Sequence, residues 1–278
     1  MNESFVRALS GVVYIALLVG ATLYSPLSFA VLFGVFMLLG VYEFSKLIRF
    51  KFSIPAVLAA LAFVFFALQK DNVHLSEIIT NLLIGFSVVV NLLLLIRLFR
   101  PATSPVPAPL PWPLLTAGYV VFPFLLILRL PFLRACTGDH HIYAPHLVIS
   151  IFILIWLNDT FAYIVGKSIG RNKLFERISP KKTIEGFLGG LVFAVAGAYV
   201  ISIYLKLMPP AYWMGTAAIL VIFGTMGDLV ESKFKRDAGV KDSGNIMPGH
   251  GGILDRLDSI IFAIPFLFLY FQIITYVS

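Results

Sequence analysis

Long apolar segments recur along the whole chain, and short charged stretches separate them. A helix needs about 20 mostly apolar residues to cross the hydrocarbon core of a bilayer. The pattern predicts an all-α, polytopic helix bundle of about nine transmembrane segments, at 8–24, 27–46, 53–69, 77–98, 112–130, 147–166, 185–206, 211–230 and 258–276. No small-residue cleavage site of the usual kind follows the first segment, so we interpret it as a retained helix rather than a signal peptide.

Composition supports the same class. Of the 278 residues, 59% are hydrophobic and only 13% are charged, which excludes a water-soluble domain of this length. The single cysteine, Cys136, excludes an internal disulfide and a cysteine metal cluster. The chain is therefore expected to be an integral membrane protein.

Lysine and arginine are unevenly distributed between the connecting segments. If the N-terminus is cytoplasmic, the basic residues that fall outside are Lys70, Arg129, Arg134 and Lys206. The positive-inside rule then predicts a cytoplasmic N-terminus and an external C-terminus. We divide the chain into N-terminal transmembrane helices, 1–130, and a C-terminal catalytic region, 131–278, with cytoplasmic loops at 167–184 and 231–257.

The stretch from Ser232 to Asp258 carries charges of both signs in an otherwise apolar chain. Its lysines and arginines can neutralise phosphate oxygens, and its carboxylates can hold a hard divalent ion such as Mg²⁺. Three residues apart at the start of an apolar run, Asp255 and Asp258 share a face if that run is helical. A solvated loop that only sets membrane topology is the alternative.

The segment 167–184 is strongly basic, with six lysines and arginines from Lys167 to Lys182 against the single acid Glu176. Ser179, Lys181 and Lys182 lead into the next predicted helix. A helix N-terminus beside lysines is a ready phosphate site. Contact with anionic lipid headgroups would use the same residues and stays open.

One predicted span contains an ionisable residue. Asp159, preceded by Asn158, lies inside the apolar segment 147–166, where a charge is costly and by default marks a functional or paired site. Tyr163 follows on the same helical face and could contact a substrate. A purely structural ion pair with a neighbouring helix is the alternative.

Three motifs together resemble the phosphatidate cytidylyltransferase (CDP-diacylglycerol synthase) family, and they cover roughly Trp156 to Asp258. Met247 occupies a position where that family is expected to carry another apolar residue. The matching residues are Asp159, Thr160, Ala162, Tyr163, Gly166 and Gly170; then the run Ser179 to Gly190; then Gly227, Asp228, Glu231, Ser232, Lys235, Arg236, Lys241, Asp242, Pro248, His250, Gly251, Gly252, Asp255, Arg256 and Asp258.

The resemblance implies that CTP and phosphatidic acid are joined to give CDP-diacylglycerol and pyrophosphate, with Mg²⁺ as cofactor and a second cation left open. The implied partners are CTP, phosphatidic acid and membrane lipids, without nucleic acid, and a homodimer is left open. The implied location is a bacterial cytoplasmic membrane, with the active site facing the cytoplasm.

A lipid phosphate is already a nucleophile, so such a reaction depends on charge stabilisation rather than on a covalent intermediate. We therefore expect metal ligation by Asp228 and Asp255 first, with Glu231 and Asp258 as further ligands. The expected catalytic residues are Asp228, Asp255, Lys241, His250 and Arg256. The expected substrate-binding residues are Ser179, Lys181, Lys182, Lys235, Arg236, Asp159 and Tyr163.

Other functions remain open at this point. A CTP-dependent lipid-alcohol kinase, or a cytidylyltransferase for another lipid phosphate, would use the same kinds of residue. An ion-coupled transporter would also place Asn158 and Asp159 at membrane depth. Roles for His140, His141 and His146, and for the proline-rich segment 101–113, do not follow from the sequence.

Overall fold

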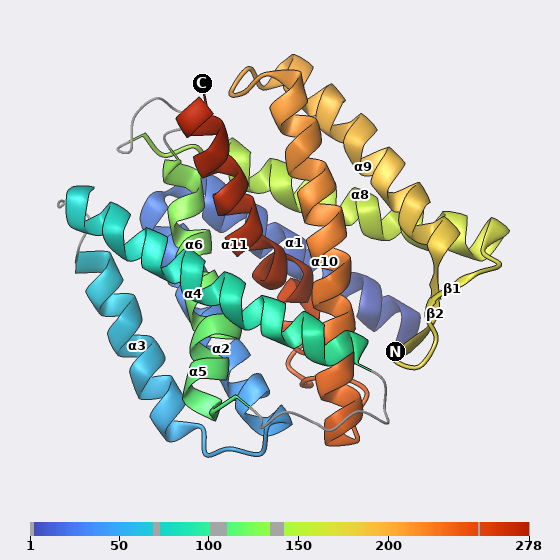
Figure 1. Ribbon diagram of the computed structural model, residues 1–278, viewed down its shortest axis with the longest axis horizontal. Helices are drawn as coiled ribbons and strands as arrows, with labels where there is room; N and C mark the ends of the chain where they lie inside the picture. The colour runs from blue at the N-terminus through green and yellow to red at the C-terminus, as the bar shows by residue number, and fades with distance from the viewer. Residues whose placement is uncertain (1–2, 69–72, 101–109, 134–141, 250, 278) are drawn as a thin grey trace.

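The computed structural model describes residues 3–68, 73–100, 110–133, 142–249 and 251–277. In Figure 1 these residues form a bundle of long helices with one small hairpin. The helices are α1 (Glu3–Tyr24), α2 (Pro26–Leu47), α3 (Ser53–Leu68), α4 (Val73–Phe99), α5 (Trp112–Thr116), α6 (Phe122–Arg129), α8 (Pro145–Ile169), α9 (Ile184–Tyr204), α10 (Pro210–Ala238) and α11 (Leu254–Val277).

The predicted membrane helices are present. Within the described residues, seven helical segments are long and apolar enough to cross a membrane, and two shorter apolar stretches lie in α1 and α3. A π-helical turn, Ala117–Val121, joins α5 to α6, and a 3-10 turn, Leu130–Phe132, extends α6, so that this part of the chain forms one span. The all-α polytopic membrane fold is thereby confirmed.

Helix α11 lies at the centre of the bundle, between α4 and α10 in Figure 1, and it also packs on α2 and α6. Its middle is almost wholly buried, including Ile261, Phe262 and Leu267. This apolar packing joins the last helix of the chain to the N-terminal helices. The packing of α11 therefore crosses residue 130, and the division of the chain at that residue stays a prediction.

Close packing of α10 on α11 brings the polar ends of both helices together. A Cβ atom at Gly227 would overlap Phe262 and the backbone oxygen of Asp258. Small residues at such a crossing let two helix backbones approach closely in a membrane. The glycine therefore sets the separation between Asp228, its neighbour in sequence, and α11.

Both predicted loops are shorter than expected. Helix α10 continues to Ala238 and ends at Gly239, which has the left-handed φ of 75° common at helix C-termini. The segment between α10 and α11 is therefore 239–253 rather than 231–257. We call it the acidic loop because its backbone contacts the carboxylates of Asp255 and Glu43. Likewise, α8 continues to Ile169, with Lys167 in its last turn, rather than ending at residue 166.

The rest of the basic segment forms an antiparallel hairpin of β1 (Lys173–Phe175) and β2 (Ser179–Thr183). The sequence did not predict these strands, because they are three and five residues long and mostly polar. Arg177, in the hairpin turn, donates to the backbone oxygens of Leu98 (3.1 Å) and Arg100 (3.2 Å). The hairpin is thus fastened to the C-terminal end of α4.

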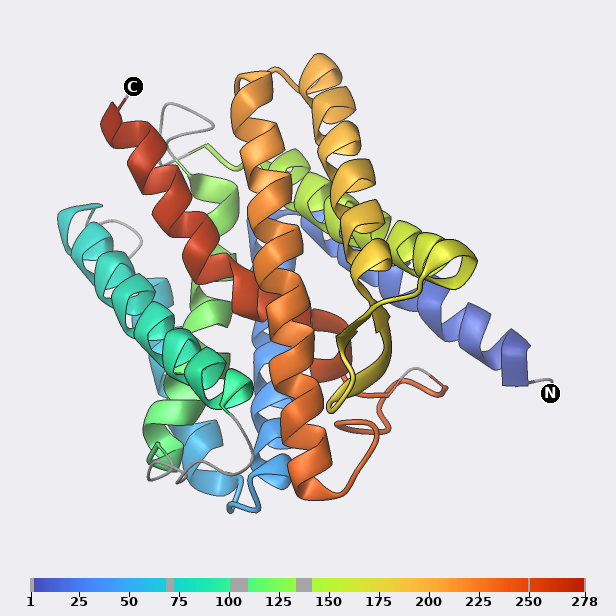
Figure 2. The same ribbon diagram turned by 45° about the vertical axis from the view of Figure 1, so that its right-hand side comes forward.

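The hairpin and the acidic loop lie at the same end of the bundle, and the C-terminus lies at the opposite end (Figure 2). The charge distribution of the sequence predicts both charged segments on one side. Which side of the membrane that end faces stays a prediction from the positive-inside rule.

Candidate active site

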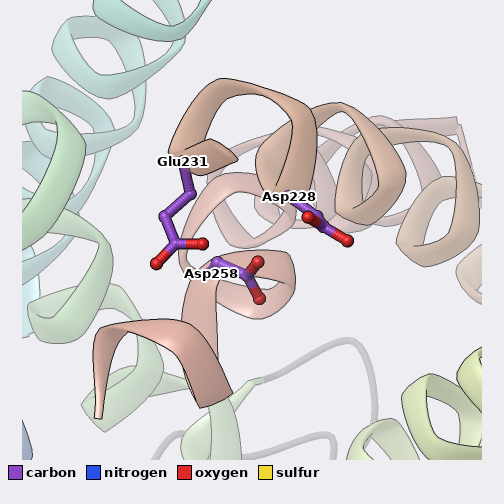
Figure 3. A group of neighbouring side chains, drawn as sticks. All are labelled: Asp228, Glu231 and Asp258. Atoms are coloured by element: carbon purple, nitrogen blue, oxygen red, sulfur yellow. The ribbon is translucent and has the colours of Figure 1, made fainter. Parts of the chain in front are cut away.

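Three carboxylates converge where α10 crosses α11 (Figure 3). Asp228 and Glu231 come from α10 and Asp258 comes from α11, and one oxygen of each lies within 4.8 Å of the others. The three-residue spacing places Asp228 and Glu231 on one helical face. Glu231 and Asp258 are buried, so the group is largely shielded from solvent.

Two lysines balance this acidic cluster. Lys182 of β2 forms an ion pair with Asp228, and Lys235 donates to Glu231 at 2.6 Å. The other oxygen of Glu231, Oε1, is buried and has no hydrogen-bond partner among the described residues. Clustered carboxylate oxygens with one unsatisfied atom fit a hard divalent cation, which prefers oxygen ligands. The acidic cluster could therefore bind a metal ion.

Asp255 lies one turn before Asp258 but is held by other partners. Its carboxylate accepts from Lys235 Nζ (2.7 Å), from the backbone N–H (2.9 Å) and hydroxyl (2.8 Å) of Ser243, and from the backbone N–H of Gly252 (2.7 Å). Gly251, with a φ of 83°, passes so close that a Cβ there would lie 2.5 Å from Asp255 Oδ2. Asp255 thus fixes the acidic loop.

This geometry changes which of the expected residues are the leading candidates for metal ligands. Asp258, rather than Asp255, accompanies Asp228 in the carboxylate group. Sequence spacing could not tell which of the two aspartates joins the cluster. The difference arises because hydrogen-bond donors of the loop between α10 and α11 bind the carboxylate of Asp255. A metal-ligand role for Asp255 stays a prediction.

Glu43 of α2 is a site residue that the sequence analysis missed. It is 1% exposed, accepts from the backbone N–H groups of Ile253 (3.1 Å) and Leu254 (2.8 Å), and lies 3.2 Å from the hydroxyl oxygen of Ser243. A carboxylate at the first turn of α11 also complements the helix dipole. The available signal was an acidic residue inside an apolar segment, the same signal that singled out Asp159.

A cavity of about 220 Å³ adjoins the acidic cluster between α1, α8 and α11. Its polar side is formed by Asp159, Asp255, Arg256 and Asp258, and its apolar side includes Ile155 and Trp156. A cavity with one charged side and one apolar side suits an amphiphile. The predicted residue Asp159 therefore lies beside the carboxylate cluster, where it also accepts from the side chain of Asn158 (3.2 Å).

The remaining predicted residues differ in their exposure and in the elements that carry them. Tyr163 is 67% exposed and does not line the cavity; Lys167 lies over its ring, 5.7 Å from the centroid. Ser179 is half-buried in the hairpin opposite Phe175. His250 lies outside the described residues. The exposed cations are Lys181 on β2, Arg236 near the end of α10, Lys241 on the acidic loop and Arg256 on α11.

The start of α9 agrees with the expectation for the basic segment. Thr183 caps the helix, and its hydroxyl accepts from the N–H of Gly186 at 3.1 Å. Lys181 and Lys182 immediately precede this cap. Positive charge and a helix N-terminus therefore coincide next to Asp228, the partner of Lys182.

Comparison with known proteins fits these features. The model of a family described as "Cytidylyltransferase family" matches residues 5–274, nearly the whole chain. The chain belongs to this family. It is therefore related to enzymes that transfer a cytidylyl group.

Curated relatives are similar over part of the chain. A "Phosphatidate cytidylyltransferase" of Bacillus subtilis (strain 168) is 52% identical over 117 residues, covering 42% of this chain and 44% of the relative. A protein of the same name from Staphylococcus aureus (strain COL) is 49% identical over 128 residues, covering 44% of this chain and 47% of the relative. The alignments thus span less than half the length of these relatives.

Proposed function

We propose that this protein is a phosphatidate cytidylyltransferase that makes CDP-diacylglycerol and pyrophosphate from CTP and phosphatidic acid. One observation carries the proposal: the carboxylate cluster Asp228, Glu231 and Asp258 lies beside Lys182 and Lys235, and its Asp258 lines a cavity with a charged and an apolar side. Such a site suits two phosphate-bearing substrates, one of them a lipid. The names of the curated relatives support the same activity.

The proposed reaction needs no covalent enzyme intermediate. An oxygen of the lipid phosphate attacks the α-phosphorus of CTP, a new P–O bond forms, and the bond to the bridging oxygen of the β-phosphate breaks. Both electrons of that bond leave with pyrophosphate. The residues must hold two anions in line and stabilise the charge on the departing group.

We assign Mg²⁺ to the carboxylate cluster of Asp228, Glu231 and Asp258. When bound, Mg²⁺ supplies positive charge to the phosphate oxygens. A second cation, and a ligand role for Asp255, remain predictions. Because Lys182 pairs with Asp228, a cation held by that carboxylate would compete with Lys182, leaving its ammonium group available to a substrate phosphate.

The basic residues divide into those suited to the nucleotide phosphates and one suited to the lipid phosphate. Lys181 and Lys182 of the hairpin are suited to nucleotide phosphates, together with Lys235, Arg236 and Lys241. Arg256 lines the cavity and is suited to the lipid phosphate. Ser179, Asp159 and Tyr163 stay candidates for substrate contact, and His250 stays a candidate for phosphate contact or proton transfer.

The test is a mass-spectrometric assay of the purified full chain with CTP, Mg²⁺ and dioleoyl phosphatidic acid. The expected products are CDP-dioleoylglycerol and pyrophosphate in equal amounts. Dioleoylglycerol as acceptor gives the comparison: a lipid kinase would phosphorylate it and release CDP. Formation of CDP with dioleoylglycerol, and of no CDP-lipid with phosphatidic acid, would replace the proposal by the kinase.

Two further parts of the proposal concern the setting of the enzyme. We propose that the site faces the cytoplasm of a bacterial inner membrane, because nucleotides are present there and the basic segments are expected inside. The homodimer that the sequence leaves open is testable by light scattering of the detergent-solubilised protein. A single-chain mass would exclude it under those conditions.

A further inference from the structure

Tyr14 of α1 carries a buried hydroxyl group without a partner. The residue is 8% exposed, and its phenolic oxygen makes no hydrogen bond within the described part of the chain. Buried tyrosine hydroxyls normally find a hydrogen-bond partner. An orphan hydroxyl in a native site is therefore a candidate for contact with a ligand.

The position of this residue points to the ligand's location. Tyr14 lines the 220 Å³ cavity together with Asp159, Arg256 and Asp258, so it shares that space with the charged side of the site. Pockets that hold a whole drug-sized ligand measure about 300–1,000 Å³. The cavity is therefore large enough for part of an amphiphile, such as a phosphate with the glycerol attached to it.

Packing does not account for the hydroxyl. The ring of Tyr14 stacks on Phe36 with 6.1 Å between centroids, and a phenylalanine would make the same contact. Helix α1 is also attached to the acidic loop through Ser10, whose hydroxyl donates to the backbone oxygen of Pro248 at 3.0 Å. The docking of α1 thus does not require an oxygen on Tyr14.

The apolar surroundings favour the lipid over the nucleotide. Ile15, next to Tyr14 on α1, lines the cavity and is 42% exposed. Since α1 belongs to the membrane part of the chain, this side chain is suited to contact with acyl chains. Lys181 and Lys182 lie on the hairpin and do not line the cavity.

We propose that Tyr14 is a binding residue for the lipid phosphate, whose hydroxyl donates a hydrogen bond to an oxygen at the phosphate–glycerol end. In this arrangement α1 forms one wall of the lipid site, and the apolar side of the cavity receives the first methylene groups of the acyl chains. The inference rests on the proposed function, because it assigns the lipid substrate of that same site.

The test compares Tyr14→Phe with Tyr24→Phe in the full chain. Tyr24 lies on the same helix but is 86% exposed, so it is a matched control. In mixed micelles, Tyr14→Phe should raise the apparent KM for dioleoyl phosphatidic acid by about tenfold, the effect of losing one hydrogen bond to a charged group. The KM for CTP and the kcat at saturating lipid should stay near wild type.

A binding measurement separates failure of this inference from failure of the proposed reaction. Stabilisation of the protein against heat by dioleoyl phosphatidic acid, without CTP, should be weaker in Tyr14→Phe than in wild type and Tyr24→Phe. That result supports the inference even if no CDP-lipid forms. Equal stabilisation of all three proteins, an unchanged lipid KM, or a raised KM for CTP alone would overturn it.

Discussion

The hydroxyl oxygen of Ser243 lies 3.2 Å from a carboxylate oxygen of Glu43, although 200 residues separate them in the chain. The same hydroxyl lies 2.8 Å from Asp255, so one serine of the acidic loop joins a carboxylate of α2 to a carboxylate of α11. Together with the two backbone N–H groups that Glu43 accepts, these contacts hold the start of α11. The position of Asp258, one turn further on, depends on that start.

Replacing Glu43 by Gln should reduce activity strongly. The amide group of glutamine would place an N–H against the backbone N–H or hydroxyl groups that the carboxylate oxygens now face. At least one buried polar group would then lack a hydrogen bond, at a cost of about 1–3 kcal/mol. A resulting displacement of α11 of about 1 Å can cost about 100-fold in rate. We expect kcat to fall 10- to 100-fold, and steady-state kinetics of the folded protein measure it.

The matched control for this change is Glu77→Gln, an exposed glutamate on α4, which should leave kcat near wild type. If Glu43→Gln lowered only the yield of folded protein, and the folded fraction kept wild-type kcat and KM, Glu43 would have no positioning role in the site.

Asp228→Asn and Asp258→Asn should abolish most activity without loss of stability. Each change removes one negative charge from a crowded cluster, which relieves repulsion but also removes a metal ligand. We expect turnover to fall by about 100-fold or more. Stabilisation of the wild type by added Mg²⁺, measured as a shift in Tm, should be lost in both variants.

Asp237→Asn is the control for the carboxylate cluster, since Asp237 pairs with Lys233 on the surface and exposed pairs contribute about 0–1 kcal/mol. Near-normal Mg²⁺-dependent turnover in both Asp228→Asn and Asp258→Asn would make the cluster a packing feature and contradict the metal assignment.

Asp255→Asn should differ from the cluster variants by lowering both activity and Tm. Asp255 accepts from two backbone N–H groups, one hydroxyl and one lysine, and an amide cannot accept from all of them. Parallel measurement of Tm and of Mg²⁺-induced stabilisation separates the roles. If Asp255→Asn kept its Tm but lost the Mg²⁺ effect, Asp255 would be a metal ligand, as the sequence alone suggested.

The two lysines before α9 should behave differently from each other. Lys182 pairs with Asp228, whereas Lys181 is exposed on the hairpin. We expect Lys182→Ala to reduce kcat/KM for CTP by about 100-fold, as for loss of a transition-state stabiliser, and Lys181→Ala to raise KM only a few-fold. Equal, small effects of both would remove Lys182 from the site.

The predicted orientation can be tested with single cysteines in a chain whose Cys136 is replaced by Ser. Ser243 is a poor labelling position because it is buried, whereas Glu176 on the hairpin and Asn245 on the acidic loop are exposed. Cysteines at 176 and 245 should resist an impermeant reagent in intact cells, and a cysteine at the exposed Tyr276 should react. Labelling at 176 or 245 but not at 276 would reverse the orientation.

The sequence by itself determined the membrane class, the helical segments and the family resemblance. Apolar runs of membrane length have few alternatives to helix, because lipid offers no partners for backbone polar groups. Asp228, Glu231 and Lys235 could be placed on one face from their spacing alone, since neighbours within a helix follow its period. The short hairpin escaped prediction, because two polar strands stabilised by contact with α4 leave little local signal.

Only the tertiary structure decided which carboxylates meet. Asp255 and Asp258 are equivalent by sequence spacing, and the approach of α10 at Gly227 selects Asp258 for the cluster, while Ser243 and Gly252 engage Asp255. Glu43 and Tyr14 join the site from α2 and α1, which lie more than 200 residues before α11 in the chain. Such contacts depend on helix packing and loop closure, which no local pattern of residues encodes.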